Sequence, residues 1–395
     1  MEPIFEQAGY RDLRHRESSG ILILHEAGAG DFVTMSAFIR EVRRVYSTAH
    51  IILVVEKCAE SLAECCPHVD EVITESFMLG NEGFQSIPDS ITKIQHIFPR
   101  LLNVARKLLR RRIDIAFVTT KGNAPTTPLL AYMSGAKDLI SHSFGNWTPL
   151  LTFQATRIYG SHTADITLGY LESLIRTRIA NRRLEAWFTP LDVANVQSMM
   201  PSSKKIYAIG LGGGKPIAHY PPESYAELMR LIAIADDDVK FVIIGGSTDV
   251  DAAKILMARV DLNRVVDLVG KISYRQTAAA LSLCDVYIGN DTGAMHLAAA
   301  TQTPVLAPFA FPIELLRPGI VLNHWYPYEV PSVIVCPRKA LPECKGSQDY
   351  FGCAAGRPHC ITRIAPRDLL EAFNLLQTRI AEHITEPILI GSNEE

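Results

Sequence analysis

The sequence has no apolar run close to the roughly 18 residues that a membrane-spanning helix needs. Its opening stretch, MEPIFEQAGYRDLRHRE, carries too many charges for a signal peptide. The formal net charge of −3 gives no general attraction to nucleic acid. We therefore expect a cytoplasmic protein, peripheral to the inner face of the membrane at most, that does not bind nucleic acid.

The eight cysteines show neither the CxxC pairs of a zinc ribbon nor the pattern of a small secreted disulfide protein. Four of them form a cluster with seven, eight and six residues between successive members: Cys336, Cys344, Cys353 and Cys360. Four thiolates match the tetrahedral coordination of zinc or iron, and His359 is a substitute ligand. The residues alone leave open a structural metal, free thiols or an oxidisable pair, and catalysis by these cysteines is not expected.

A dinucleotide-binding fingerprint is also incomplete. Gly28 and Gly30 follow an apolar strand expected at 21–24, but the third glycine of GxGxxG would fall at Val33, so nicotinamide binding is disfavoured. Asp31 stands at the start of the following helix. Taken alone, it reads as an N-terminal acid that the helix dipole favours.

What the sequence does contain is an alternation of short apolar strands and helices. Strands are expected at 51–55, 71–74 and 113–119, and helical segments around 57–66 and 94–112. This alternation is typical of a parallel sheet with helices on both faces, so the predicted fold class is α/β. The basic stretch 106–112 is read as a solvated helix end, with binding of an acidic acceptor or lipid phosphate as the alternative.

A second domain is expected because the polar stretch 176–205 interrupts this scheme, which restarts at Ile206. The predicted boundaries are 1–185 for the first domain, 205–365 for the second with its cysteine-rich loop 336–360, and 366–386 for a helix that crosses back to the first domain.

Polar and glycine-rich turns follow the expected strands of both domains, where parallel sheets bind ligands. Lys121, Asn123 and Thr126 follow the strand at 113–119 and are predicted to line the acceptor side. In the second domain, Gly212, Gly213 and Gly214 form a loop whose amides can cradle phosphate, with a flexible linker as the alternative. Asp249 follows the strand at 241–246 and is read equally as a ribose ligand or a helix cap.

The stretch from Cys284 to Pro308 predicts a strand, a polar turn, a small-residue helix and another strand. Asn290, Asp291 and Thr292 can cap that helix and leave its first amides to hold an anion such as a diphosphate. The alternative is that these residues only cap and pack, and His296 alone reads as a satisfied helix histidine.

The segment GNDTGAMHLAAA resembles the GxDTGxxHLAAA segment of glycosyltransferase family nine, the heptosyltransferases of bacterial surface-glycan synthesis. The resemblance implies that Asp291, Thr292 and Gly293 contact the diphosphate and sugar of the donor, with His296 nearby. GDFVTMSAFIREVRRVY is similar to another segment of that family, which implies that Asp31 is the catalytic base. Ala37 stands there where the family often has proline.

Further segments extend the resemblance to about residues 20 to 385. Aligned on HYPPESYAEL, the family's lysine falls at Ala218, so Lys215 is predicted to supply the positive charge at the diphosphate. Lys271 and Ile272 match residues that lie against the nucleotide base. CITRIAP matches the end of a four-cysteine loop, which in protein-modifying heptosyltransferases binds iron, although the cysteine spacing differs.

The resemblance implies a GT-B architecture, in which two Rossmann-like domains face each other across a cleft. The implied activity is inverting transfer of a sugar, such as heptose from an ADP-heptose-like donor, to a hydroxyl of a surface glycan, lipid-linked glycan or protein. No catalytic metal is required, because helix ends and lysine can stabilise the diphosphate. The sequence leaves open whether the protein forms a homo-oligomer. The alternatives are a GT-B nucleotide-sugar epimerase and a non-catalytic binding or assembly protein.

Overall fold

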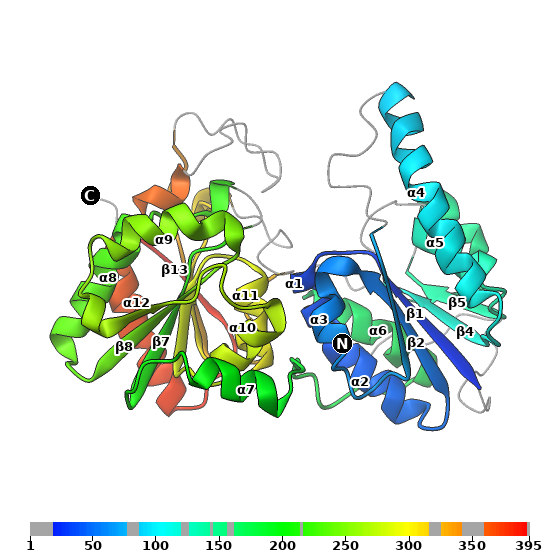
Figure 1. Cartoon of the computed structure of the whole chain (residues 1–395), viewed down its shortest axis with the longest axis horizontal. Helices are drawn as coiled ribbons and strands as arrows, with labels where there is room; N and C mark the ends of the chain where they lie inside the picture. Colours follow the sequence, from blue (N-terminus) through cyan, green and yellow to red (C-terminus); the bar gives the residue numbers. More distant parts are fainter. Residues whose placement is uncertain are drawn as a thin grey trace. The chain divides into compact units, whose positions relative to one another are not determined.

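The structure is a computed structural model that describes residues 19–76, 87–119, 126–142, 145–155, 162–213, 216–315, 325–341 and 359–392. The chain divides into a first unit, Met1–Tyr159 with Thr163–Arg182, and a second unit, Gly160–His162 with Arg183–Glu395. Each unit is built on one sheet with helices packed against it (Figure 1). The change of unit at Arg182 lies within the polar stretch 176–205.

The first unit contains a six-stranded parallel sheet in the order β3-β2-β1-β4-β5-β6. Its strands are β1 (Gly20–His25), β2 (His50–Glu56), β3 (Glu71–Glu75), β4 (Ile115–Val118), β5 (Asp138–Ser141) and β6 (Phe153–Gln154). All four residues of the central run Ile21–Leu24 are 0% exposed. This burial on both faces explains why the strand is a continuous apolar run without alternation.

The helices of the first unit cover both faces of its sheet. They are α1 (Ala29–Thr34), α2 (Ser36–Val45), α3 (Glu60–Ala63), α4 (Ile87–Leu108), α5 (Thr126–Met133) and α6 (Thr163–Ile175). On one face, Leu108 of α4 and Leu130 of α5 join a core cluster with Leu22. On the other, Phe38 of α2 meets the ring of Phe117 edge-on with centroids 5.2 Å apart.

The second unit contains a seven-stranded parallel sheet in the order β13-β12-β11-β10-β7-β8-β9. Its strands are β7 (Lys205–Gly210), β8 (Val239–Ile244), β9 (Val265–Asp267), β10 (Val286–Gly289), β11 (Val305–Pro308), β12 (Ser332–Cys336) and β13 (Ile388–Gly391). Both sheets thus confirm the predicted α/β class.

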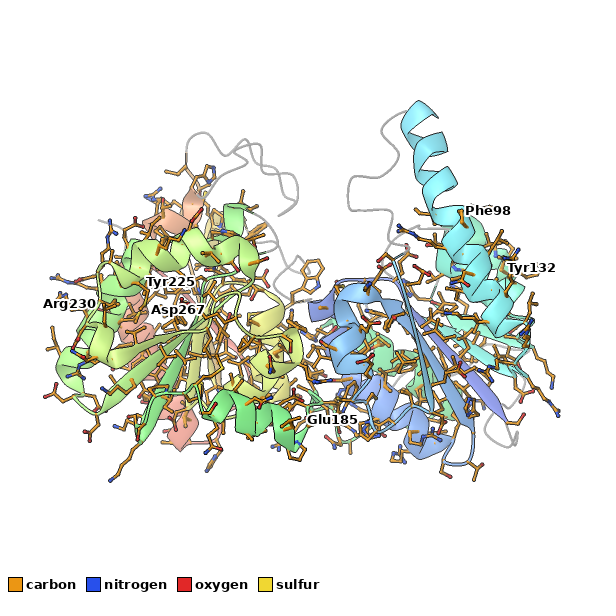
Figure 2. All side chains as sticks on the ribbon, in the orientation of Figure 1. Phe98, Tyr132, Glu185, Tyr225, Arg230 and Asp267 are labelled. Carbon is orange, nitrogen blue, oxygen red and sulfur yellow. The ribbon has the colours of Figure 1, made fainter. Side chains whose placement is uncertain are left out.

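The helices of the second unit are α7 (Pro190–Gln197), α8 (Pro222–Ala235), α9 (Val250–Met257), α10 (Tyr274–Leu281), α11 (Gly293–Ala300) and α12 (Pro366–Ala381). The helix α8 is amphipathic: Tyr225 is fully buried, while Arg230 points outward on the same helix (Figure 2). Residues of α8, α9 and α12 share one core cluster with the sheet.

The helix α12 packs within the second unit. There Leu369, Phe373 and Leu376 lie in the core beside α8 and the sheet. That residues 366–386 cross back to the first domain stays a prediction.

The order of strands places a switch point in each sheet. From β1 the chain moves outward to β2 and β3 and then returns to β4 on the other side, and from β7 it moves to β8 and β9 and then returns to β10. Open parallel sheets bind ligands at the carboxyl ends of the strands beside such points. Among the described helices, none combines the length and the apolar character needed to cross a membrane.

Candidate active site

In the second unit, three loops meet at the carboxyl ends of β7, β10 and β8, around the switch point. They comprise Leu211–Gly213 after β7, Asn290–Thr292 after β10 and Gly245–Asp249 after β8. These are the segments that the sequence predicts to bind the donor, and their contacts bring them together.

Asn290 joins two of these loops from a fully buried position, with 0% of its surface exposed. Its side-chain amide donates to the carbonyl oxygens of Leu211 at 2.9 Å and Gly212 at 3.0 Å. Its oxygen accepts from the Tyr220 amide at 3.1 Å and from the Tyr225 hydroxyl at 2.8 Å. Asn290 therefore holds the glycine loop, and it does not cap α11 as its position before the helix suggested.

Thr292 is the residue that caps α11. Its Oγ1 accepts from the Ala294 amide at 3.2 Å, and its carbonyl oxygen accepts from the Met295 amide at 3.1 Å. No oxygen of the described residues accepts from the Gly293 amide, and Asp291 to Ala294 are partly exposed. The capped turn thus offers an amide and the positive end of the helix dipole to an anion.

Close packing explains two glycines beside this turn. A Cβ atom at Gly210 would lie 2.2 Å from the hydroxyl oxygen of Tyr287, and one at Gly289 would lie 2.4 Å from it. Tyr287 is fully buried, burial raises the pKa of its hydroxyl, and that hydroxyl lies 3.4 Å from Thr292 Oγ1. Only glycine leaves room for this ring under the capped turn.

Asp249 is a cap in this structure. Its Oδ2 accepts from the Gly246 amide at 2.7 Å, and the residue is 6% exposed. A Cβ atom at Gly212 or at Gly245 would lie 2.9 Å from the same oxygen. The carboxylate therefore caps the turn after β8 and lies close to the loop after β7, while its role as a ribose ligand stays a prediction.

His219 is a residue of the donor loop that the sequence did not single out. Its Nε2 lies 3.0 Å from the Gly213 carbonyl oxygen, and a Cβ atom at Gly213 would lie 2.3 Å from its ring. Ala218, where the family's lysine falls, is buried with 3% exposure. Gly214 and Lys215 lie outside the described residues, so their predicted phosphate contacts stay predictions.

Other predicted donor residues have structural partners. The Lys271 ammonium pairs with the Asp267 carboxylate at 2.6 Å. Ile272 packs against the cluster of Val196 and Ala279 formed by α7 and α10. His296, 5% exposed, meets the ring of His162 edge-on with centroids 6.3 Å apart. It is thus a buried histidine in an aromatic cluster, which leaves its role at the donor a prediction.

In the first unit, Asp31 lies in the first turn of α1 and is partly exposed. Glu26, directly after β1, is 6% exposed, and it accepts hydrogen bonds from the hydroxyls of Thr126 and Thr127. Burial, with the carboxylate of Glu56 nearby, raises the pKa of Glu26 to about 7. Lys121 and Asn123 lie outside the described residues, and Thr126 is buried.

Glu26 was missed because a polar residue after a strand reads as an ordinary loop residue. Glu56 is a second buried glutamate at the end of a strand, since it is the last residue of β2 and is 4% exposed. A glutamate at the carboxyl end of two neighbouring strands was the signal available in the sequence, because such positions meet at one edge of a parallel sheet.

The cysteine cluster is only partly described. Cys336 ends β12 and is fully buried, and burial raises the pKa of its thiol. Cys360 is also buried, and its amide donates to Nδ1 of the neighbouring His359 at 2.5 Å. Cys344 and Cys353 lie outside the described residues. Within the described ranges, no three His, Cys, Asp or Glu side chains gather as a metal site, so iron or zinc here stays a prediction.

Sequence comparison gives a partial match to known enzymes. Residues 172–317 match the family model for glycosyltransferase family 9 (heptosyltransferase). Over 95 residues the chain is 27% identical to lipopolysaccharide heptosyltransferase 2 of Escherichia coli strain K12. This match covers 23% of the chain and 27% of that enzyme, so the chain spans about a quarter of the length of the curated relatives it matches.

Solved structures match over most of the chain. A family 9 glycosyl transferase from Veillonella parvula is similar with a TM-score of 0.72 and 19% identity, over 91% of this chain and 98% of that one. The E. coli ADP-heptose lipopolysaccharide heptosyltransferase II is similar with a TM-score of 0.65 and 18% identity, over 92% and 99%.

These likenesses establish the GT-B fold, with two Rossmann-like domains. The resemblance that GNDTGAMHLAAA carries is confirmed, because this segment lies inside the matched residues. The family match and the fold of both units lead to one conclusion: residues 172–317 are similar to glycosyltransferase family 9, the heptosyltransferase family, and the whole chain has the GT-B fold.

Proposed function

We propose that this protein transfers heptose from a nucleotide diphosphate donor of the ADP-heptose type to a hydroxyl group of an acceptor. The family 9 match supports the reaction class, and the E. coli structure of similar fold is named for ADP-heptose. The acceptor that we propose is a hydroxyl of a surface glycan or of a protein side chain.

The observation that carries the proposal is the partly exposed turn of α11 at the switch point of the second sheet. Thr292 caps the helix so that the Gly293 amide is left for a ligand, while Asn290 fixes the glycine loop beside it. Two sets of backbone amides at a helix end suit the two phosphates of a nucleotide diphosphate.

The proposed reaction is a single displacement with inversion. The acceptor oxygen attacks the anomeric carbon while the bond from that carbon to the diphosphate oxygen breaks, and the diphosphate leaves with the bonding electrons. Asp31 takes the proton of the acceptor hydroxyl as general base. The turn at Thr292 and the loop at Gly212 and Gly213 stabilise the charge of the leaving diphosphate, and Lys215 is the predicted cation.

Donor binding tests the site. Replacing Asp291 by Ala should weaken ADP-heptose binding by about tenfold, because the turn loses a polar contact to the ligand worth about 1.4 kcal/mol. Asp251→Ala is the matched control, because Asp251 lies on α9 with an 89% exposed side chain paired to Lys254. Equal donor affinity of Asp291→Ala and the parent in calorimetry, with the fold intact, would remove this site.

Product analysis tests the reaction class. Incubation with ADP-heptose should release ADP when an acceptor is added, and a panel of lipid-linked glycan, polysaccharide and protein acceptors identifies the class used. A GT-B epimerase would act on the donor alone. A binding protein would hold ADP-heptose without releasing ADP under any condition.

A further inference from the structure

Glu26 is a buried carboxyl group at the switch point of the first sheet that the proposed displacement does not use. It follows His25, the last residue of β1, and is 6% exposed. The neighbouring strand across the switch point is β4, which pairs with β1 in parallel. Glu26 therefore lies at the edge where a ligand of this domain is expected.

The contacts of Glu26 tie α5 to the end of β1. Its Oε2 accepts from the Thr126 hydroxyl and, at 3.4 Å, from the Thr127 hydroxyl, and the Thr127 amide also donates to the carboxyl group. Thr126 and Thr127 form the first turn of α5. A carboxylate at this position is favoured by the helix dipole and by three donors.

The end of β1 also contacts the end of β4, through His25, the residue before Glu26. Nδ1 of His25 lies 3.0 Å from Oγ1 of Thr119, and the Thr119 amide donates to the Leu24 carbonyl oxygen at 3.0 Å. Thr119 follows β4 and Thr126 opens α5. Two consecutive residues at the end of β1 thus hold the end of β4 and the start of α5.

The surroundings of Glu26 make its charge sensitive to pH near neutrality. Burial is the main reason that its pKa is raised to about 7, and the Glu56 carboxylate at the end of β2 raises it further, while the threonines lower it. Among the described residues, other titratable groups at this edge include His25 of β1, Asp31 of α1 and Cys58. Cys58 is an exposed residue whose thiol is partly desolvated, which raises its pKa, and the carboxylates of Glu56 and Asp31 raise that pKa further, so both lie near it.

We propose that Glu26 is a positioning residue for the acceptor: ionised Glu26 holds the first turn of α5 beside the β1–α1 turn that carries Asp31. Only Ala27 and Gly28 separate Glu26 from α1, so a movement of its backbone is transmitted to Asp31 over a short turn. Protonation weakens the carboxyl group as an acceptor for Thr126 and Thr127, which changes the position in which the first turn of α5 is held. This inference rests on the proposed function of Asp31.

Steady-state kinetics of the full chain with ADP-heptose and acceptor test the role in catalysis. In the parent, KM for the acceptor should rise as the pH falls through about 7, while KM for the donor changes little. Glu26→Gln should remove this pH step and raise the acceptor KM at pH 8 by about tenfold, the effect of one lost charge-assisted hydrogen bond. Glu56→Gln should keep the step and move it to lower pH, because it removes a neighbouring negative charge.

Hydrogen exchange of the α5 amides provides a readout that does not depend on transfer. After correction for the intrinsic rate, the protection of α5 should differ between pH 6 and pH 8 in the parent, and be equal at both in Glu26→Gln. If the pH step in acceptor KM survives in Glu26→Gln, or if the protection of α5 does not depend on Glu26, the positioning role is wrong. If α5 follows Glu26 but no acceptor supports transfer, the proposed function fails and the link from Glu26 to catalysis falls with it.

Discussion

Replacement of Asn290 by Ala should cost the second unit a large share of its stability. The variant leaves the Leu211 and Gly212 carbonyl oxygens, the Tyr220 amide and the Tyr225 hydroxyl without their present partner. Leu211, Tyr220 and Tyr225 are at most 3% exposed, whereas Gly212 is partly exposed and can bond to water. At about 1 to 3 kcal/mol for each unpaired buried group, the expected loss is about 4 kcal/mol.

The assay is urea unfolding, with hydrogen exchange of β7 and β10 amides to assign the loss to the second unit. Asn263→Ala is the matched control, because Asn263 is an exposed asparagine whose side chain donates to Asp261, and its loss should change stability by less than about 0.5 kcal/mol. Where Asn290→Ala stays folded, it should also bind ADP-heptose more weakly, since the glycine loop loses its anchor. An unfolding midpoint equal to that of the parent would refute this account of the site.

Gly210, Glu26 and the cysteine cluster each give a further prediction. Gly210→Ala should destabilise the second unit by about 2 kcal/mol or more in thermal unfolding, because the added Cβ would lie 2.2 Å from the Tyr287 hydroxyl oxygen, and a loss below about 0.5 kcal/mol would contradict that packing. For Glu26, the folded-state pKa of about 7 exceeds the value of 4.5 expected for the unfolded chain. Its contribution to stability should therefore be fully present below pH 4.5 and fall by up to about 3 kcal/mol as the pH rises through about 7, and Glu26→Gln should lack this fall in a pH series of urea curves. Elemental analysis of protein purified without chelator should find about one zinc or iron per chain if the four clustered cysteines converge, and the absence of metal would remove that site.

Much of the fold could be predicted because buried parallel strands appear in the sequence as short apolar runs. The strands at Ile21–Leu24 and Ile51–Val55 could be predicted from their own residues alone. Burial on both faces requires apolar residues throughout such a strand. The sheet against which a helix packs is harder to predict. The apolar stripe of α12 predicts a packed helix, but nothing in that stripe says which of two sheets it covers.

The site was predicted where a local pattern has a local cause. Thr292 caps α11 because a hydroxyl before a helix reaches the amides of its own first turn. Asn290 stands two residues earlier and was read in the same way, yet its amide is used by carbonyl groups of the loop after β7. Glu26 likewise depends on threonines of α5. Contacts between residues so distant in the sequence carry no local signature.

The most direct test of the proposed transfer is the turnover of Asp31→Asn. Asn has nearly the size of Asp and can still stand in the first turn of α1, but it cannot take a proton from an acceptor hydroxyl. We predict near-normal ADP-heptose binding and melting temperature, with the rate of ADP release in the presence of acceptor reduced by about two or more orders of magnitude. An Asn variant that transfers heptose at the parent rate would contradict the account, because Asp31 would then be only an acid at a helix start.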